Sequence, residues 1–430
     1  PPRVNLVLVC TAPAGQDQGK EGGVDETTLG GRLREIRSWH QLSLREAAGA
    51  AGLSVLSWGQ VERGDKPVAS RHMLEAMARA LRVHPTELTG QPWPPQDLVS
   101  SEAHAGLWGI EIALERYEFG VDPDLTDPDL TVPAWPEIAA DLERLEKLRH
   151  YSADYAAQGE LTPMLLGQLH GAYARMPERR REILLGLISA YSSAAMMTKR
   201  LGVRGLPTLA ARAVAQCAQA LGDPVWLGYA VWLRGAATGL LDRAAQYRRS
   251  VTAAETLSSQ LDASDALQAC GMLHLSAALA AAAQADHDTT ATHLQEASAL
   301  ASRMDTEVGT WANLWFGPAN VGIWRTSLAV ELGEPGQAVQ AAKAVHPELL
   351  PNARQAQFWA DLARALITTK KSREKGVRVL LHAEQLAPQL IYHDVFVREA
   401  IADLLRQARR EAGGRELRGL AWRLGVTPLG

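Results

Sequence analysis

The sequence predicts an all-α fold, in which a small domain of five helices precedes a long array of helical pairs. Capping residues and glycine stops divide residues 28–90 into short helical segments. From residue 163 onward, Ala- and Leu-rich stretches follow one another with short connectors, which is typical of antiparallel helical pairs. The alternation of β-branched and polar residues that marks strands is almost absent.

Two short helices joined by a tight turn are predicted within residues 42–64. Ser43 is placed to cap the first helix, and Glu46 three residues later completes a capping box. Gly52 ends this helix, as glycine commonly does, and Ser54 caps a second helix. Apolar residues at helical spacing predict further helices over residues 29–37, 73–81 and 85–88.

A set of residues with a recognisable spacing runs through this segment: Leu29, Arg32, Leu33, Arg34, Leu42, Ser43, Glu46, Ala48, Ala51, Gly52, Leu53, Ser54, Val61, Glu62, Arg63, Gly64, Met73, Leu74, Ala80 and Leu81. With these residues, the segment from 29 to 90 resembles the Cro/cI-type (XRE) helix-turn-helix family. The resemblance implies a lambda-repressor-like domain that places the helix after Ser54 in the major groove of double-stranded DNA. It also implies that Arg37 pairs with Glu62 as an internal brace.

The resemblance places the base-reading positions on Val55, Leu56 and Gln60, with Ser57 beside them. Gln60 and Ser57 can hydrogen-bond to base edges, whereas Val55 and Leu56 can contact only thymine methyl groups. Leu44 stands where the family usually has a glutamine that touches DNA. We therefore expect modest discrimination between sequences, to which dimer geometry and DNA shape add. The predicted DNA-binding residues, which include basic residues placed to contact phosphates, are Arg45, Ser54, Val55, Leu56, Ser57, Gln60, Arg63, Lys66 and Arg71.

Charge is distributed unevenly around this domain. Residues 28–90 carry nine basic and six acidic side chains, a net charge of +3, whereas residues 91–160 carry four basic and fifteen acidic ones, a net charge of −11. A weakly basic module beside an acidic segment fits DNA binding confined to the first. We predict that residues 91–162 form an acidic, proline-containing helical linker, which is either a solvated connector or a shield for the basic face.

The N-terminal residues 1–27 are predicted to be a disordered arm, with the alternative that the apolar stretch 4–9 adds as a strand elsewhere. The chain has no run of eighteen apolar residues, so we expect no transmembrane helix and no membrane partner. Cys10, Cys217 and Cys270 lie far apart and lack metal-ligand spacing. This usage predicts buried or inert thiols and is consistent with a reducing cytoplasm.

The remainder of the chain, residues 163–425, is predicted to consist of successive helices. Turns at residues 286–288, 333–335 and 370–372 each precede an Ala-rich helix, and small residues recur near the same offset. This pattern resembles degenerate tetratricopeptide (TPR) repeats, which implies a solenoid of stacked helical pairs with a concave surface. The predicted helices span residues 163–175, 178–200, 206–221, 224–240, 244–260, 265–284, 288–303, 308–316, 318–332, 335–345, 351–369, 373–387, 391–410 and 414–424.

One segment of this array, residues 310–325, combines aromatic and polar side chains around a Gly-Pro break. The chain from residue 29 onward resembles large actinobacterial regulators that join a Cro/cI-type domain to a helical-repeat domain. In architecture it also resembles peptide-pheromone regulators. That resemblance implies that the side-chain amides of Asn313 and Asn320 hold a peptide backbone, since an amide both donates and accepts. Trp311, Trp315 and Arg325 complete the candidate ligand site, with core packing of the tryptophans as the alternative.

Sequence motifs of catalysis are absent: we find no zinc-protease, nucleophile-elbow, P-loop or dinucleotide-binding pattern, and the histidines are scattered. The sequence thus predicts no enzymatic activity, metal site or cofactor. It predicts a cytoplasmic, sequence-specific DNA-binding transcriptional regulator, which acts as a homodimer and senses a peptide, a small molecule or a protein partner at the concave face of its repeats. The alternative is a TPR-like interaction scaffold with only weak, nonspecific DNA binding, which the hydrophobic Val55 and Leu56 keep open.

Overall fold

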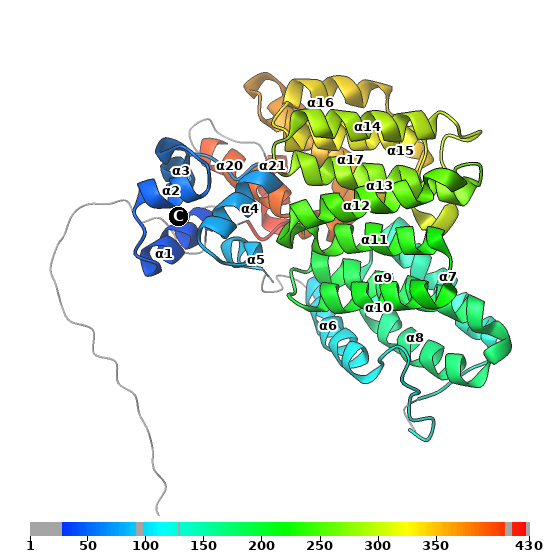
Figure 1. Cartoon of the computed structure of the whole chain (residues 1–430). Coiled ribbons are helices and arrows are strands. Elements are labelled where there is room, and N and C mark those ends of the chain that lie inside the picture. Colours follow the sequence, from blue (N-terminus) through cyan, green and yellow to red (C-terminus); the bar gives the residue numbers. More distant parts are fainter. Residues whose placement is uncertain (1–27, 92–97, 128–129, 409–414, 427–430) are drawn as a thin grey trace, which may run out of the picture.

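The computed structural model describes residues 28–91, 98–127, 130–408 and 415–426, and all regular structure within these residues is helical (Figure 1). The predicted all-α fold, with a small N-terminal domain followed by a larger helical domain, is confirmed. The predicted arm over residues 1–27, with its alternative strand and Cys10, lies outside the described residues. Within the described ranges we find no helix with the combination of length and hydrophobicity that spanning a bilayer requires.

Five short helices form the N-terminal domain: α1 (Leu29–Trp39), α2 (Leu44–Ala50), α3 (Val55–Glu62), α4 (Arg71–Ala80) and α5 (Pro85–Thr89). The predicted capping box is present, because the Ser43 hydroxyl accepts from the backbone N–H of Glu46 while the Glu46 carboxylate accepts from the backbone N–H of Ser43. Gly52 and Gly64 follow α2 and α3 with φ of 68° and 73°. Glycine adopts this left-handed conformation without a steric cost, so both helices end where predicted.

The segment that follows the N-terminal domain is part of the helical domain rather than a linker. Its helices are α6 (Leu98–Arg116), α7 (Trp135–Lys147) and α8 (Tyr155–Arg175). Helices α6 and α8 cross at two glycines, where a Cβ on Gly106 would come within 2.7 Å of the Cα of Gly159. The predicted helical linker over residues 91–162 is helical in α6, α7 and the start of α8, but these helices pack into the helical domain, where the small residues allow their close approach. Pro163, where a helix was predicted to begin, lies inside α8.

Ten further helices form a two-layer array: α9 (Arg180–Arg200), α10 (Leu206–Leu221), α11 (Pro224–Thr238), α12 (Arg243–Leu257), α13 (Ser264–Ala282), α14 (His287–Ala301), α15 (Pro318–Glu331), α16 (Pro335–Ala341), α17 (Asn352–Ile367) and α18 (Arg373–Leu386). The odd-numbered helices from α9 to α17 each contact the next odd-numbered helix, and each even-numbered helix packs against its neighbours in the chain. Successive helical pairs thereby stack into an elongated, repeat-like domain (Figure 1).

Residues 308–316, predicted as a helix, instead form a loop that contains one short 3₁₀ turn at Trp311–Asn313. Ala312, Asn313 and Trp315 all have φ near 50°, which an α-helix does not accommodate. The ring of Phe316 is fully buried against Gly271 of α13, which has no Cβ in its way. Insertion of this ring into the core pulls the backbone out of helical geometry.

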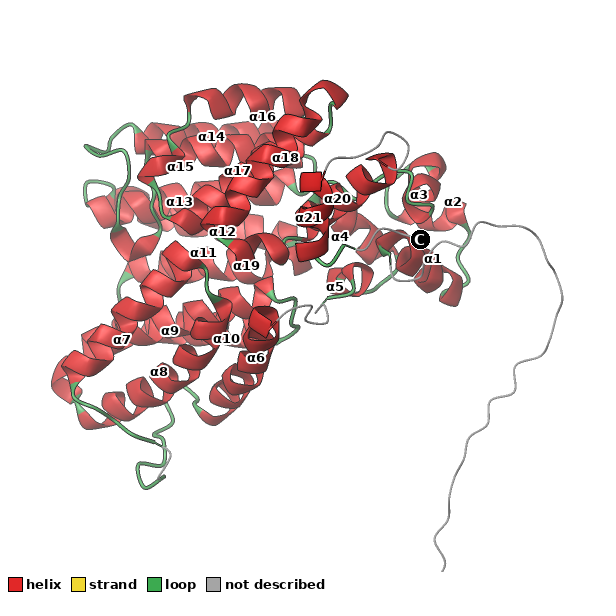
Figure 2. Ribbon diagram, turned by 180° about the vertical axis from the view of Figure 1, so that it is seen from behind, coloured by secondary structure: helices red, strands yellow, loops and turns green. Residues whose placement is uncertain are grey.

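The C-terminal helices return to the N-terminal domain: α19 (Pro388–Tyr392), α20 (Val395–Ala408) and α21 (Arg415–Arg423). The single helix predicted over residues 391–410 is therefore wrong, because a break separates α19 from α20. Phe396, at the start of α20, is buried within the hydrophobic core of the N-terminal domain. Figure 2 shows α20 and α21 beside α4, between the two domains.

The two described cysteines, Cys217 and Cys270, are buried free thiols, as predicted. Burial raises the pKa of Cys217 to about 12 and that of Cys270 to about 11. Both side chains are therefore protonated at neutral pH, which makes them poor nucleophiles and poor metal ligands.

Candidate nucleic-acid interface

A buried ion pair between Arg37 of α1 and Glu62 of α3 holds these two helices together. The Nε and Nη2 atoms of Arg37 donate to the two carboxylate oxygens of Glu62 at 2.6 and 3.0 Å, and the indole Nε1 of Trp58 donates to the same carboxylate at 2.6 Å. The side chains of Arg37 and Glu62 are only 14% and 6% exposed. The hydrogen bond to Glu62 raises the pKa of Arg37. The brace implied by the sequence resemblance is therefore present, and it sets the position of α3.

The opposite face of α3 is open to solvent at its N-terminal end. Val55 is 44% exposed and Leu56 is 68% exposed, although both side chains are apolar. The Ser54 hydroxyl caps the helix by accepting from the backbone N–H of Ser57 at 3.1 Å. Gln60, one turn further on, is partly exposed and its side-chain amide has no partner among the described residues. This face therefore offers two apolar contacts and one free amide.

Three basic side chains predicted to contact phosphates lie on the domain surface beside this face. Arg45 on α2 is exposed. Arg63 pairs with Asp65 at 2.9 Å, but both side chains are more than half exposed, so the pair is weak and can be exchanged for a phosphate. Lys66 donates to the Ser57 hydroxyl at 3.0 Å and is likewise exposed. All three cations are thus exposed and can contact an external anion.

Arg71 does not belong to this set, and its predicted phosphate contact is wrong. Its guanidinium pairs with Glu331 of α15, and its backbone N–H donates to the other carboxylate oxygen at 2.9 Å. The Glu331 side chain is 1% exposed. The Arg71 guanidinium also lies 5.4 Å from the centre of the Phe396 ring. Arg71 is not available to DNA while its guanidinium is held by this buried carboxylate, which Arg364 also approaches at 3.6 Å.

The contact between Arg71 and Glu331 is part of a larger interface between the two domains, which we call the seam. Arg243 of α12 donates to both carboxylate oxygens of Glu75 on α4, at 2.6 Å from Nη2 and 3.1 Å from Nε, and both side chains are less than a tenth exposed. Arg364 of α17 donates to the backbone carbonyl of Ala69 at 2.7 Å. Its guanidinium lies 4.7 Å from the centre of the Phe396 ring. The seam therefore fixes the orientation of the N-terminal domain.

Sequence reasoning missed the seam. The partners lie far apart in the chain: 168 residues separate Glu75 from Arg243, and 260 separate Arg71 from Glu331. A possible signal was the charge of α4, since Arg71 and Glu75 lie one turn apart beside apolar residues that face the domain core. Nothing local identified which distant side chains would pair with them.

The aromatic residues of the candidate ligand segment are packed into the helical domain. The Trp311 ring lies 5.0 Å from the ring of Trp226, and it packs at the edge of the main core. Trp315 packs against a neighbouring apolar cluster that includes Phe358. These contacts favour the core-packing alternative for both tryptophans.

The polar residues of this segment have partners within the chain. Asn313 donates from Nδ2 to the carboxylate of Glu146 at 2.9 Å. Asn320 is 2% exposed, and its Oδ1 accepts from Nε of Arg354 at 2.8 Å. Arg325 is exposed and donates to the Ser298 hydroxyl at 3.3 Å. The five residues predicted as one ligand site are thus not brought together around a free surface, because the two amides stabilise the fold.

A comparison with protein families identifies the N-terminal domain. The helix-turn-helix domain family matches residues 28–89, which span α1 to α5. The apo form of the competence regulator ComR from Streptococcus vestibularis aligns with 78% of this chain and 98% of its own, with 13% sequence identity and a TM-score of 0.21. This likeness is too remote to support any inference, and no curated protein matches the chain significantly. Residues 28–89 therefore form a helix-turn-helix domain. The helical domain packs against it through the seam.

Proposed function

We propose that this protein is a transcriptional regulator that binds double-stranded DNA through α3. The observation that carries the proposal is that one face of α3 is exposed to solvent, while the opposite face is held by the buried pair of Arg37 and Glu62. A helix-turn-helix domain reads DNA by laying this helix in the major groove, so the exposed face is the one that would contact the bases. Val55 and Leu56, exposed at its start, suit thymine methyl groups, and the free amide of Gln60 suits a base edge. Arg45, Arg63 and Lys66 would hold the phosphates on either side, together with the N-terminal end of α3 at Ser54.

The proposal assigns the domain to the Cro/cI type on its sequence resemblance, and it assigns no catalytic role to the chain. One α3 contacts only a few base pairs, so we propose that two chains bind as a homodimer across half-sites about one helical turn apart. The regulator would act in the cytoplasm, where its DNA is found.

The helical domain, which we propose to be TPR-like, would sense a peptide, a small molecule or a protein partner. The seam supports the proposal that the helical domain senses the ligand and the N-terminal domain binds DNA. Because buried ion pairs hold α4 against α12 and α15, any ligand that shifts the packing of these helices also shifts the orientation of α3. A dimer whose two α3 helices are reoriented would no longer match the spacing of its half-sites.

Fluorescence anisotropy on DNA from upstream of the protein's own gene, against shuffled DNA, tests the proposal over a series of salt concentrations. We expect a preference for the upstream DNA that survives physiological salt. The double variant Gln60→Ala, Arg63→Ala should weaken binding to the upstream DNA by about tenfold or more. The matched control is Gln340→Ala, Lys343→Ala, which removes an exposed glutamine and a basic residue at the same spacing on the helical domain.

The second candidate function is an interaction scaffold, and the exposed Val55 and Leu56 are the observation that favours it, since apolar surface also suits a protein partner. Salt separates the two candidates. Nonspecific DNA binding rests on counterion release and vanishes as salt rises, whereas specific binding keeps its preference. Equal affinity for both DNAs at every salt concentration would reject the regulator and support the scaffold.

A further inference from the structure

A pocket of about 40 Å³ opens at the seam, and both domains line it. The N-terminal domain contributes His84 and Thr86, from the start of α5. The helical domain contributes the turn from α9 to α10, with Lys199 and Arg204, and the end of α11 with Thr238. The residues that line the pocket include two basic side chains and a histidine but no carboxylate. Arg204 pairs with Glu87 at 2.9 Å, so Lys199 is the basic lining side chain without a carboxylate partner among the described residues.

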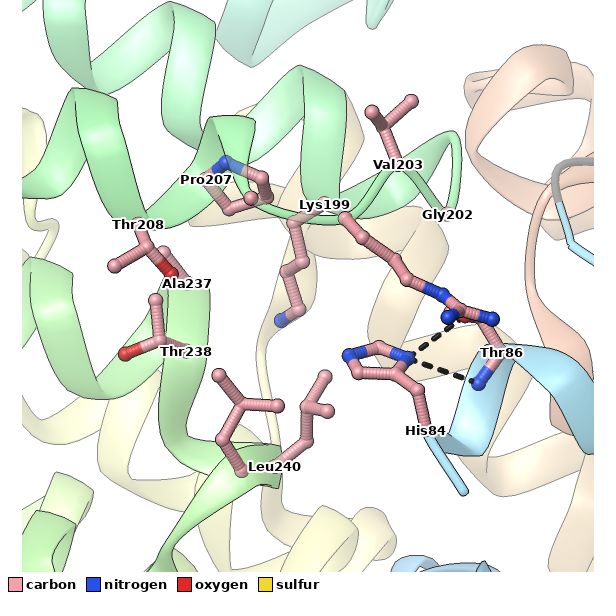
Figure 3. A pocket seen from close by; sticks show the side chains of 13 residues that line it. His84, Thr86, Lys199, Gly202, Val203, Pro207, Thr208, Ala237, Thr238 and Leu240 are labelled. Carbon is pink, nitrogen blue, oxygen red and sulfur yellow. Dashed lines mark hydrogen bonds between the residues drawn. The ribbon is translucent and has the colours of Figure 1, made fainter.

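Lys199 is the central basic side chain of the pocket. Figure 3 shows its amine directed into the space between the His84 ring and the side chains of Thr238 and Leu240. Among the described residues, Lys199 has no hydrogen-bond or ion-pair partner. Burial lowers the pKa of Lys199 well below its ordinary value, and the nearby guanidinium groups lower it further. This environment disfavours the charged form of Lys199, and an anion bound beside the amine would supply the counter-charge that favours it.

His84 supplies a second donor on the opposite wall. Its Nδ1 accepts from the backbone N–H of Thr86 at 3.2 Å. An acceptor at Nδ1 requires the neutral tautomer with its proton on Nε2. Burial, together with Arg204, lowers the pKa of His84, which favours this neutral form. The Nε2–H group faces Lys199 in Figure 3 and is therefore available to a ligand.

The N-terminal end of α10 adds to the positive potential. Gly205, Pro207 and Thr208, from its first turn, line the pocket. This turn carries no acidic residue, and no side chain caps it. Pro207 has no N–H, and the N–H groups of Leu206 and Thr208 donate to the carbonyls of Arg204 and Gly205 at 2.9 Å, so α10 contributes the partial positive charge of its N-terminus rather than backbone donors.

We propose that this pocket binds the carboxylate group of a small effector. Lys199 and Nε2 of His84 would hold the two carboxylate oxygens, and the rest of the effector would extend through the opening. A volume of about 40 Å³ holds roughly three water-sized atoms, which matches a carboxylate better than a phosphate. Because His84 belongs to the N-terminal domain and Lys199 to the helical domain, the carboxylate would bridge the seam and hold the domains together.

Binding to this pocket does not depend on DNA, whereas its regulatory consequence rests on the proposed function. A ligand that bridges the seam stabilises one orientation of the N-terminal domain, and hence one orientation of α3. The exposed Arg204, which pairs with Glu87 at 2.9 Å, crosses the seam at the edge of the same pocket. This ion pair joins the helical domain to the N-terminal domain beside the place where the carboxylate would also join them.

Saturation-transfer NMR on the full chain, without DNA, tests the proposal with acetate as the probe and chloride as the balancing salt. We expect saturable binding of acetate and none of acetamide, which has nearly the same shape without the charge. The variant Lys199→Met should weaken acetate binding by about tenfold or more, since it removes a charge-assisted hydrogen bond. Lys343→Met, which alters an exposed lysine on the helical domain, should leave binding unchanged.

Circular dichroism verifies that each variant is folded, and His84→Asn provides a second variant that leaves Lys199 intact. Equal acetate binding by the wild-type chain and both pocket variants would overturn the proposal, as would no saturable binding by the wild type. Tighter binding of inorganic phosphate than of acetate would reject the carboxylate class. N-acetylglycine against propionate then distinguishes a peptide C-terminus from a small metabolite. If the wild-type chain binds acetate but shows no preference for the upstream DNA in the anisotropy experiment, the proposed function is rejected and the carboxylate site stands.

Discussion

Helices α3 and α4 are neighbours of similar length in one small domain, yet their surfaces are used in opposite ways. On α3, the apolar Val55 and Leu56 face solvent. On α4, the charged Arg71 and Glu75 face the helical domain and are paired there. The comparison shows that residue type alone does not predict which face of a helix is exposed to solvent. The exposed apolar side chains of α3 are free to contact a partner outside the chain, whereas the buried charges of α4 are paired within it.

The largest loss of stability should follow from removing the ion pair between Arg37 and Glu62 that holds α3 against α1. Glu62→Ala would leave the Trp58 indole without its acceptor and Arg37 without its counter-charge in a buried site, although Arg37 keeps its hydrogen bond to the Leu42 carbonyl at 2.7 Å. We expect the N-terminal domain to lose about 3–5 kcal/mol of unfolding free energy, because an uncompensated buried charge remains. Urea denaturation measures the loss. Asp65→Ala, in an exposed pair with Arg63, should cost less than about 1 kcal/mol; equal losses in the two variants would contradict the assignment of the brace.

A buried group without charge extends the comparison to pH. His170 on α8 is 4% exposed, its Nε2 lies 2.6 Å from the Tyr191 hydroxyl, and burial lowers its pKa to about 4. Since the unfolded chain takes up this proton near pH 6.5, the stability contributed by neutral His170 is complete above pH 6.5. It should be lost as the pH falls towards 4, by about 3 kcal/mol.

Denaturation of wild-type and His170→Gln chains at pH 7 and pH 4 measures this term. Glutamine keeps a polar group near Tyr191 but does not titrate, so the variant should lose less stability on acidification. His287→Gln changes a histidine that is 51% exposed and should behave as the wild type. A His170→Gln chain with the same pH dependence as the wild type would contradict the assignment.

Loosening the seam should have a smaller effect on stability. Glu75→Ala removes the carboxylate that Arg243 holds, but the Nη1 atom of Arg243 keeps its hydrogen bond to Gln246 at 2.7 Å. We therefore expect a loss of about 2 kcal/mol rather than the full cost of an orphaned cation. Hydrogen exchange of the α4 amides measures it, with α2, which lies away from the seam, as the internal reference. Unchanged exchange in α4 would show that the pair does not hold the domains together.

How much the sequence could predict depends on the range of the interactions. The ends of α2 and α3 follow from Ser43, Glu46, Gly52 and Ser54, whose partners lie within a few residues, so their prediction was correct. Arg37 and Glu62 are 25 residues apart, and only the family resemblance connected them.

Three features that the sequence did not predict involve distant partners. Residues 308–316 have a helical composition, but Phe316 inserts beside Gly271 and the loop results. Arg71 looks like a phosphate contact until Glu331 is brought beside it. The pocket lysine, Lys199, carries no local signal, since a lysine in the last turn of a helix usually faces solvent.

Replacing exposed apolar residues on α3 should have the smallest effect on stability. Leu56→Ser changes a side chain that is 68% exposed, so the unfolding free energy should change by less than about 0.5 kcal/mol. Affinity for the specific DNA should nevertheless fall, because contact with a thymine methyl is lost. Anisotropy and denaturation on the same preparation separate the two effects. A large loss of stability would show that Leu56 is structural after all.

Photo-crosslinking tests most directly that α3 presents the DNA-binding face. A benzophenone amino acid would be placed at position 56 on α3 or at position 241 in the helical domain, where Leu241 is 56% exposed. We predict crosslinks to the specific DNA from position 56 and none from position 241. Equal crosslinking from both positions, or none from position 56 while the protein is bound to that DNA, would contradict the assignment of α3.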